Sequence, residues 1–360
     1  MTMNFALSSM NKRRLGIAII LAAHWAIAPA ASIAPTALVA TAATDQALST
    51  TLAQWNRDEH PDLKAVIVLR HGNVIGEQYY NGELPTTLHD IRSAGKSITS
   101  LLIGAALDQG KIRSVSDSVQ QYWPETRGTA IGDVRLQDVL TMRSGLAAFD
   151  EDPDSPGNED KMDEAADPFA FAFAVPRADP PGTRYRYNSL TAYIAGIIVE
   201  KAAHQTMADF AGSALFAPLG ITEWQWAGDA KGHTKGQGNL SLTARDLAKI
   251  GHMVLDKGRY QGRQVLSASW IEESLKPRFP ISATDPYADS YGYFWYYKVQ
   301  DVKGVKVPVS FASGNGGNKI YVVPSLDLVV AITSSAYGKG YGQRRSEAIL
   351  KAILPLYAEP

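Results

Sequence analysis

The chain of 360 residues contains no cysteine. Without thiols it can form no disulfide framework, no iron–sulfur cluster and no Cys-ligated zinc site, and it has no thiolate nucleophile. It also lacks a surplus of positive charge, because 35 Lys and Arg residues are matched by 36 Asp and Glu residues and the net charge is -1. Nucleic-acid binding depends on clustered basic residues that neutralise phosphates, so we expect no nucleic-acid partner.

Motifs of two large hydrolase classes are absent as well. There is no Gly-x-Ser-x-Gly sequence, which argues against an α/β-hydrolase nucleophile elbow, and no His-Glu-x-x-His zinc motif. The seven histidines show no spacing typical of metal ligands. An apolar fraction of 45% and a charged fraction of 20% are those of an ordinary globular protein.

The first 44 residues have the pattern of an export signal. Basic residues at 12–14 precede an apolar stretch at 15–23, and small-x-small sites follow at 28–30 and 40–42. This order is typical of a cleaved secretory peptide, and the Arg pair leaves a twin-arginine route open. The alternative is an uncleaved anchor, but His24 and two prolines interrupt the run before it reaches the ~20 residues that span a bilayer. We therefore expect a periplasmic or secreted protein with no stable membrane span after cleavage.

The remainder of the chain has strand-like ends and a helical middle. Strand patterns are expected at 63–69 and 74–80, and again at 292–297, 305–311, 320–323 and 328–333. Helical periodicity starts at Ser93 and returns at 136–142, 190–203, 244–257 and 344–357. Strands at both ends predict one sheet built from the two terminal parts, with the helical block inserted between them.

This pattern predicts a mixed α and β fold. After a signal peptide and linker at 1–44, we expect one domain at 45–360. One lobe would combine 45–92 with 255–360 and hold an antiparallel sheet flanked by helices, and 93–254 would form an inserted, mostly helical lobe. A cleft between two such lobes is the usual place for a binding site.

One segment has unusual charge. Residues 150–167 include nine acidic residues and a single basic one, Lys161. A solvated loop is the interpretation that we favour, because runs of like charge are usually exposed. The alternatives are that the segment lies at the rim of the cleft or that it binds calcium. The spacing of Asp150, Asp152 and Asp154 is that of an EF-hand loop, but the glycine that such a loop requires is missing.

The most suggestive chemistry lies at Ser93-Ala94-Gly95-Lys96, where the first long helix of the domain begins. Residues at i and i+3 share a helix face, so the Lys96 amine can reach the Ser93 hydroxyl and remove its proton. For that the amine must be neutral, and we expect burial beside apolar residues such as Ile98 to lower its pKa. The N–H groups at the helix start would stabilise charge that develops during acyl transfer. A helix-capping serine is the alternative.

Further motifs follow in a fixed order. They are Leu-Thr-Met-Arg-Ser-Gly-Leu at 140–146, Pro-Gly-Thr-x-Tyr-x-Tyr-Asn-Ser at 181–189, Pro-Leu-Gly at 218–220, Leu-Thr-Ala-Arg-Asp-Leu-Ala at 242–248 and Gly-Asn-Gly-Gly at 314–317. With these motifs and the Ser-x-x-Lys element in this order, the chain resembles the serine β-lactamase and penicillin-binding superfamily. Within it, the chain resembles the class C-like branch that contains esterases, D-amino-acid peptidases and 6-aminohexanoate-dimer hydrolases. The resemblance implies a β-lactamase/transpeptidase-like fold from about residue 45 onward.

The resemblance also implies roles for single residues. Ser93 matches the acylated nucleophile and Lys96 its partner base. Tyr187 matches the tyrosine that exchanges a proton with the leaving group, and a phenol suits this role only where a nearby cation favours its ionised form. A core aromatic is the alternative for Tyr187. No metal or organic cofactor is implied, because nucleophile and base are both side chains.

The chain departs from the family pattern at two places. The usual Tyr-x-Asn is Tyr-Asn-Ser here, so the hydroxyl of Ser189 replaces an amide that would contact the substrate. The Lys-Thr-Gly strand motif aligns with Asn315, Gly316 and Gly317, which offer no cation for a substrate carboxylate. The backbone N–H of Asn318 would join that of Ser93 as an oxyanion hole. We therefore expect weak turnover of β-lactams and better activity on uncharged esters or on amides.

The function predicted is an exported serine hydrolase that cleaves a small ester or amide through an acyl-serine. A β-lactamase or D-Ala-D-Ala carboxypeptidase that acts on cell-wall-type substrates is the first alternative. A non-catalytic protein that binds peptidoglycan or another partner on the same fold is the second. We expect a set of five aromatic residues to lie in the core, and the alternative is that they line an apolar pocket for the acyl group. They are Tyr287, Tyr291, Phe294, Trp295 and Tyr296.

Overall fold

The computed structural model describes residues 35–358, so most of the predicted export signal lies outside the described residues. The first described helix, α1 (Pro35–Ala53), crosses the predicted end of the linker at residue 44, and that boundary stays a prediction. From Ala42 onward the chain forms one compact unit. Within the described part of the chain, no helix combines the length and the apolar character that crossing a membrane would need.

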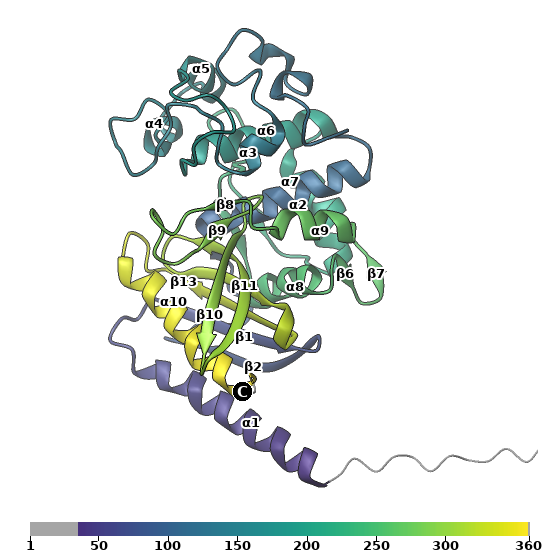
Figure 1. Ribbon diagram of the computed structural model, residues 1–360, viewed down its shortest axis with the longest axis vertical. Helices are drawn as coiled ribbons and strands as arrows, with labels where there is room; N and C mark the ends of the chain where they lie inside the picture. The colour runs from purple at the N-terminus through teal and green to yellow at the C-terminus, as the bar shows by residue number, and fades with distance from the viewer. Residues whose placement is uncertain (1–34, 359–360) are drawn as a thin grey trace, which may run out of the picture. The chain divides into compact units, whose positions relative to one another are not determined.

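The main sheet in the described residues is antiparallel and has eight strands in the order β2-β1-β13-β12-β11-β10-β9-β8 (Figure 1). Its N-terminal strands are β1 (Leu63–Arg70) and β2 (Asn73–Tyr79). Its later strands are β8 (Phe279–Pro280), β9 (Ser290–Tyr291), β10 (Tyr296–Val302), β11 (Val305–Gly314), β12 (Asn318–Val323) and β13 (Leu328–Ser334). Strand β1 pairs directly with β13, with Val66 opposite Ile332. The two ends of the chain therefore build one sheet, which confirms the predicted fold.

Helices cover both faces of this sheet. A Cβ atom on Gly251 of α8 (Ala244–Leu255) would lie 2.8 Å from the side chain of Ile320. The neighbouring Lys319 shares a small cavity with Glu347 of α10 (Gly340–Ile353). Because successive strand residues point to opposite faces, α8 and α10 lie on opposite sides of the sheet. Double coverage explains why β12 and β13 are buried along their whole length.

The middle of the chain is helical, as predicted. Its helices are α2 (Gly95–Asp108), α3 (Leu136–Leu140), α4 (Glu159–Asp163), α5 (Pro168–Ala174), α6 (Ser189–Ala203) and α7 (Met207–Ala211). A small sheet of three short strands accompanies them: β3 (His89–Asp90), β4 (Gln225–Trp226) and β5 (Leu240–Leu242). Later in the chain come the hairpin β6 (Arg259–Tyr260) with β7 (Arg263–Gln264), and helix α9 (Ala268–Leu275).

The strand predicted at 292–297 is wrong in its first part, because β10 begins only at Tyr296. The N–H of Gly292 donates to the carbonyl of Trp295 at 2.7 Å, and the N–H of Phe294 donates to Leu140 at 2.9 Å. Phe294 also has a φ of 59°, which no strand residue adopts. These residues form a turn whose aromatic side chains are buried, so Phe294 and Trp295 belong to the core.

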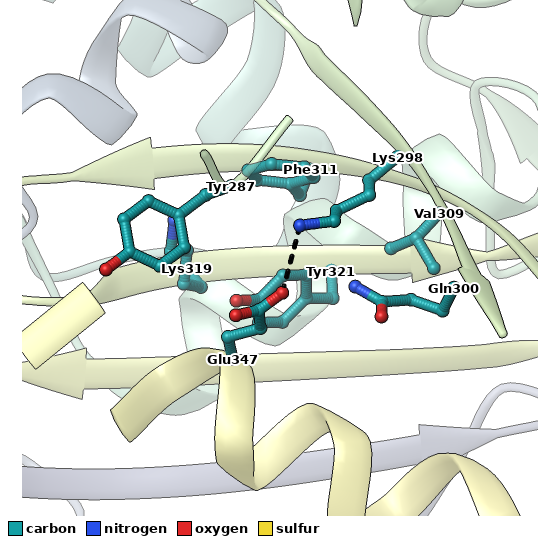
Figure 2. A pocket seen from close by; sticks show the side chains of 8 residues that line it. All are labelled: Tyr287, Lys298, Gln300, Val309, Phe311, Lys319, Tyr321 and Glu347. Carbon is teal, nitrogen blue, oxygen red and sulfur yellow. Dashed lines mark hydrogen bonds and ion pairs between the residues drawn. The ribbon is translucent and has the colours of Figure 1, made fainter. Parts of the chain in front are cut away.

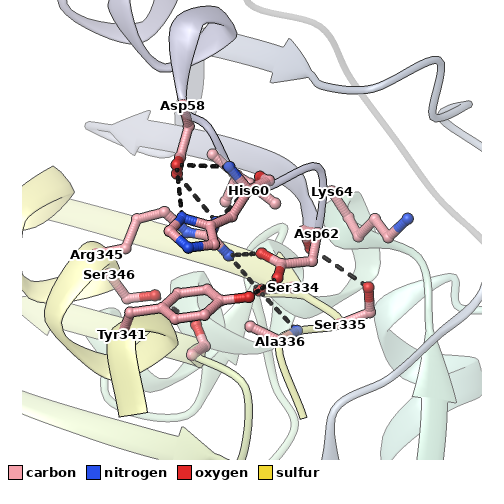
Figure 3. A network of polar contacts seen from close by, with 12 residues as sticks. Asp58, His60, Asp62, Lys64, Ser334, Ser335, Ala336, Tyr341, Arg345 and Ser346 are labelled. Carbon is pink, nitrogen blue, oxygen red and sulfur yellow. Dashed lines mark hydrogen bonds and ion pairs between the residues drawn. The ribbon is translucent and has the colours of Figure 1, made fainter. Parts of the chain in front are cut away.

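A polar network fastens the segment before β1 to α10 (Figure 3). The guanidinium of Arg345 donates to Asp58 at 3.0 Å and to the hydroxyl of Ser334 at 2.7 Å, and it pairs with Asp62 at 2.5 Å. Tyr341 donates a further hydrogen bond to Asp62. The Arg345 side chain is only 4% exposed, so its charge depends on these partners.

Candidate active site

Ser93 lies in a single 3-10 turn, Arg92–Ala94, directly before α2. Arg92 has a φ of 52°, and its N–H donates to the carboxylate of Asp90 at 2.8 Å, which holds the turn in this conformation. The end of β11 packs against the same turn. A Cβ on Gly314 would come within 2.0 Å of the Ile91 carbonyl oxygen. Glycine is thus required where the strand approaches the serine turn, a contact that motif spacing alone does not specify.

The Nζ of Lys96 donates three hydrogen bonds. Its acceptors are the Oγ of Ser93 at 3.0 Å, the Oγ of Ser189 at 3.1 Å and the carbonyl of Gln237 at 2.8 Å. An ammonium group has three N–H donors, so every one of them is used. The pairing with Ser93 was expected from the i, i+3 spacing. The contact with Gln237 was not expected, because a main-chain carbonyl is present in every residue type and leaves no pattern in the sequence.

Lys96 is fully buried, yet its pKa is not lowered. Burial acts to lower the pKa, but attraction to Tyr187, Glu159 and Asp150 outweighs it, so the pKa lies above its ordinary value. The expectation of a neutral lysine is therefore wrong. The expectation was based only on apolar neighbours in the same helix, such as Ile98. The groups that raise the pKa of Lys96 come from other parts of the chain.

Tyr187 lies next to the lysine. The Lys96 Nζ is 5.0 Å from the centre of its ring. The following residue, Asn188, caps α6 by accepting a hydrogen bond from the N–H of Thr191 at 2.7 Å, which fixes where the chain enters the helix. Ser189, the first residue of α6, is fully buried against Lys96. The fold thus brings Ser93, Lys96, Tyr187 and Ser189 into one cluster, and the contact of Ser189 with substrate stays a prediction.

The predicted oxyanion residues lie at the turn between β11 and β12. Gly316 and Gly317 have φ values of 86° and 95°. A Cβ on Gly317 would lie 2.3 Å from the carbonyl of Gly342, so this part of the turn packs against α10. The side chain of Asn318 donates to the carbonyls of Asn315 and Ser334. Gly314 packs against the serine turn, and the oxyanion and substrate roles of 315–318 stay predictions.

The acidic segment is only partly a solvated loop. Asn158 donates from its side-chain amide to the carbonyls of Asp150 and Asp152, both at 3.1 Å, and folds the segment back on itself. Asp152 and Asp154 are exposed, whereas Asp150 is half-buried with both carboxylate oxygens closed off from solvent, and together with Glu159 it raises the pKa of Lys96. The segment therefore reaches the serine cluster. Over residues 35–358, no group of three or more His, Asp or Glu is arranged to hold a metal ion.

A second buried lysine lies elsewhere, on the α10 face of the sheet (Figure 2). Lys319 donates to the hydroxyl of Ser313 at 2.7 Å, and burial lowers its pKa to about 7. Next to it, Lys298 pairs with Glu347 at 3.1 Å. The adjoining cavity of about 10 Å³ holds little more than one water molecule, so it is too small for a substrate.

Comparisons with known proteins give the family and the fold of this chain. The beta-lactamase family model matches residues 57–354. The 6-aminohexanoate-dimer hydrolase of Paenarthrobacter ureafaciens is 29% identical over 275 residues, which are 70% of this chain and 69% of that protein.

Two solved structures share the fold. The penicillin-binding protein homologue from Caulobacter crescentus aligns with a TM-score of 0.70 at 18% identity, over 87% of this chain and 97% of that one. The class C beta lactamase from Rhodobacter sphaeroides aligns with a TM-score of 0.62 at 17% identity, over 88% and 99%.

Proposed function

The chain belongs to the beta-lactamase family, and on that premise we propose that it is a serine hydrolase that cleaves small esters or amides through an acyl intermediate on Ser93. The observation that carries the proposal is the hydrogen bond of 3.0 Å between the buried Lys96 ammonium and the Ser93 hydroxyl. A serine becomes a useful nucleophile only beside a group that takes its proton or stabilises its anion. A capping serine has no need of a buried cation.

The charge state of Lys96 decides which residue transfers the proton and which stabilises negative charge. A lysine whose pKa is raised cannot accept the Ser93 proton, so the acceptor that we propose is the oxygen of Tyr187 in its phenolate form, beside the Lys96 ammonium. Ser93 Oγ then attacks the carbonyl carbon, and the proton held by Tyr187 passes to the leaving group. Water releases the acyl group by the reverse sequence. Throughout, the Lys96 ammonium stabilises negative charge on Ser93 and on Tyr187.

Two observations support an uncharged ester or an amide as the substrate. The turn at 315–317 has no cation to bind a substrate carboxylate, which β-lactams carry. The relative with 29% identity is named as the hydrolase of the 6-aminohexanoate dimer, a small amide. The missing cation favours acyl compounds without a carboxylate at that position, and the relative favours an amide as the bond that is cleaved.

Export is part of the proposal, and the order of basic, apolar and small residues in the first 44 positions supports it. The test is N-terminal sequencing of the protein recovered from the periplasm or medium of an expressing bacterium. A mature N-terminus near residue 30 or 42 is expected. An intact N-terminus in the cytoplasmic fraction would contradict export.

Intact-mass measurement tests the hydrolase proposal. The wild type, Ser93→Ala and the control Ser116→Ala, which alters an exposed serine, are each exposed briefly to p-nitrophenyl acetate or to benzylpenicillin. An acetyl adduct on the wild type and the control, absent from Ser93→Ala, is expected. Rapid turnover of penicillin instead would favour the β-lactamase or carboxypeptidase alternative. No adduct with either reagent would favour a non-catalytic binding protein.

A further inference from the structure

The proposed acyl transfer makes no use of a buried carboxylate that adjoins its lysine. Both carboxylate oxygens of Asp150 are closed off from solvent, and neither makes a full hydrogen bond to any described residue. A buried carboxylate without hydrogen bonds destabilises the folded protein. The presence of such a carboxylate is explained if its negative charge acts on neighbouring groups.

Three elements of the described chain bring polar groups to Asp150. Lys96 of α2 attracts its negative charge, and Glu159 of α4 repels it. The hydroxyl and backbone N–H of Ser189 in α6 also favour the anion, although their geometry falls short of a full hydrogen bond. Burial is the largest influence, and it raises the pKa of Asp150 to about 6.

The position of Ser189 links this carboxylate to the nucleophile. Ser189 Oγ already accepts a hydrogen bond from Lys96 at 3.1 Å, so its own O–H is left to point toward Asp150. Lys96 in turn donates to Ser93 at 3.0 Å. Asp150 therefore lies at the end of a polar chain that runs through Ser189 and Lys96 to Ser93. Because its oxygens are shut off from solvent, Asp150 acts on Ser189 and Lys96 and does not contact a bound substrate.

We propose that Asp150 is a positioning residue for acyl transfer, which in its ionised form orients Ser189 and holds the Lys96 ammonium against Ser93. The inference rests on the proposed hydrolase function. Protonation of Asp150 weakens the acceptor for the Ser189 hydroxyl and removes a countercharge of Lys96. The enzyme therefore loses activity as the pH falls through the range in which Asp150 takes up a proton.

The backbone around Asp150 makes a clean substitution feasible. Its carbonyl accepts from the Asn158 amide, and the N–H of Gly157 donates to Ala147 at 2.9 Å. Neither contact involves the carboxylate, so Asp150→Asn leaves them intact. Asp154→Asn is the matched control, because it makes the same chemical change on an exposed side chain of the same segment.

The experiment is the pH profile of kcat/KM for p-nitrophenyl acetate. The wild type and Asp154→Asn are expected to lose about tenfold for each pH unit below about pH 6. Asp150→Asn is expected to be at least about tenfold slower near pH 8 and to show no such decline, because its amide does not titrate. Asp150→Glu restores the charge and should restore an acid limb. A wild type without this limb, or an Asp150→Asn enzyme that keeps both the limb and the rate, would overturn the proposal.

A second variant decides the matter if Asp150→Asn fails to fold. Ser189→Ala removes a group that favours the Asp150 anion, so the acid limb should move to higher pH. An unchanged limb would refute the linkage. These failures differ from failure of the hydrolase proposal, in which Ser93→Ala would keep the ester turnover of the wild type.

Discussion

The carbonyl oxygen of Gln237 lies 2.8 Å from the Nζ of Lys96, the shortest of the three hydrogen bonds that this lysine donates. Main chain from the segment after β4 thus completes the acceptor set of a buried cation. Three acceptors and three nearby anionic or ionisable groups explain why Lys96 stays charged despite its burial.

Lys96→Met is expected to lower both the activity and the stability of the protein. A methionine of similar length removes the charge that stabilises the Ser93 and Tyr187 oxygens, so kcat/KM for p-nitrophenyl acetate should fall by about 10²–10⁴. Removal of this buried cation leaves the Asp150 carboxylate without its countercharge, so urea unfolding should also show a loss of stability. An active Lys96→Met enzyme would contradict the role assigned to the ammonium.

Gly314→Ala is expected to damage the serine turn. The added Cβ would meet the Ile91 carbonyl at 2.0 Å, so the strand end or the turn must shift. We expect at least about tenfold lower kcat/KM, because small displacements at the reacting atoms are costly. Gly340→Ala is the control, since its Cβ would meet only the Arg344 side chain at 3.5 Å. Equal activity of the two variants would show that the contact can relax.

Lys319→Met is expected to stabilise the protein in a pH-dependent manner. The folded-state pKa of about 7 lies below the ordinary value of 10.5, so between these values the unfolded state binds more protons and wild-type stability rises with pH. The advantage of the variant should therefore be greatest at or below pH 7 and shrink by about 2–4 kcal/mol towards pH 10. Urea unfolding at several pH values measures it. The exposed Lys306→Met should show no such trend.

Arg345→Met is expected to destabilise the fold by about 3–5 kcal/mol, because it leaves the Asp58 and Asp62 carboxylates without their cation. Equilibrium urea unfolding is the measurement. Arg344→Met, at the exposed neighbouring position, is the control and should change stability by less than about 0.5 kcal/mol. A loss in Arg345→Met no larger than in this control would show that the network in Figure 3 is replaceable.

The parts of the site that were predictable from sequence are local. Ser93 and Lys96 are three residues apart, so helical geometry alone brings their side chains together. Asp150, Gln237 and Glu159 reach the same lysine from distant segments, and no spacing rule relates them to it. The charge of Lys96 was wrongly predicted for this reason, since long-range attraction decided it.

In the fold, too, locally determined features were predictable and features set by distant residues were not. Alternating and periodic apolar patterns predicted the central strands and the longer helices, because burial on one or both faces imposes them. At 292–295 aromatic residues favoured a strand, but Tyr293 and Phe294 donate their N–H groups to Ser274 and Leu140. Tertiary partners thus overrode local propensity.

The pairing of β1 with β13 also sets the order in which the molecule can assemble. Val66 and Ile332 become neighbours only after almost the whole chain has left the ribosome, so the centre of the sheet cannot close during synthesis. Until then, β1 has β2 as its only strand partner in the main sheet of the described residues. Until that pairing forms, the unpaired edge of β1 can bind strands of other chains, so the protein is exposed to aggregation during synthesis.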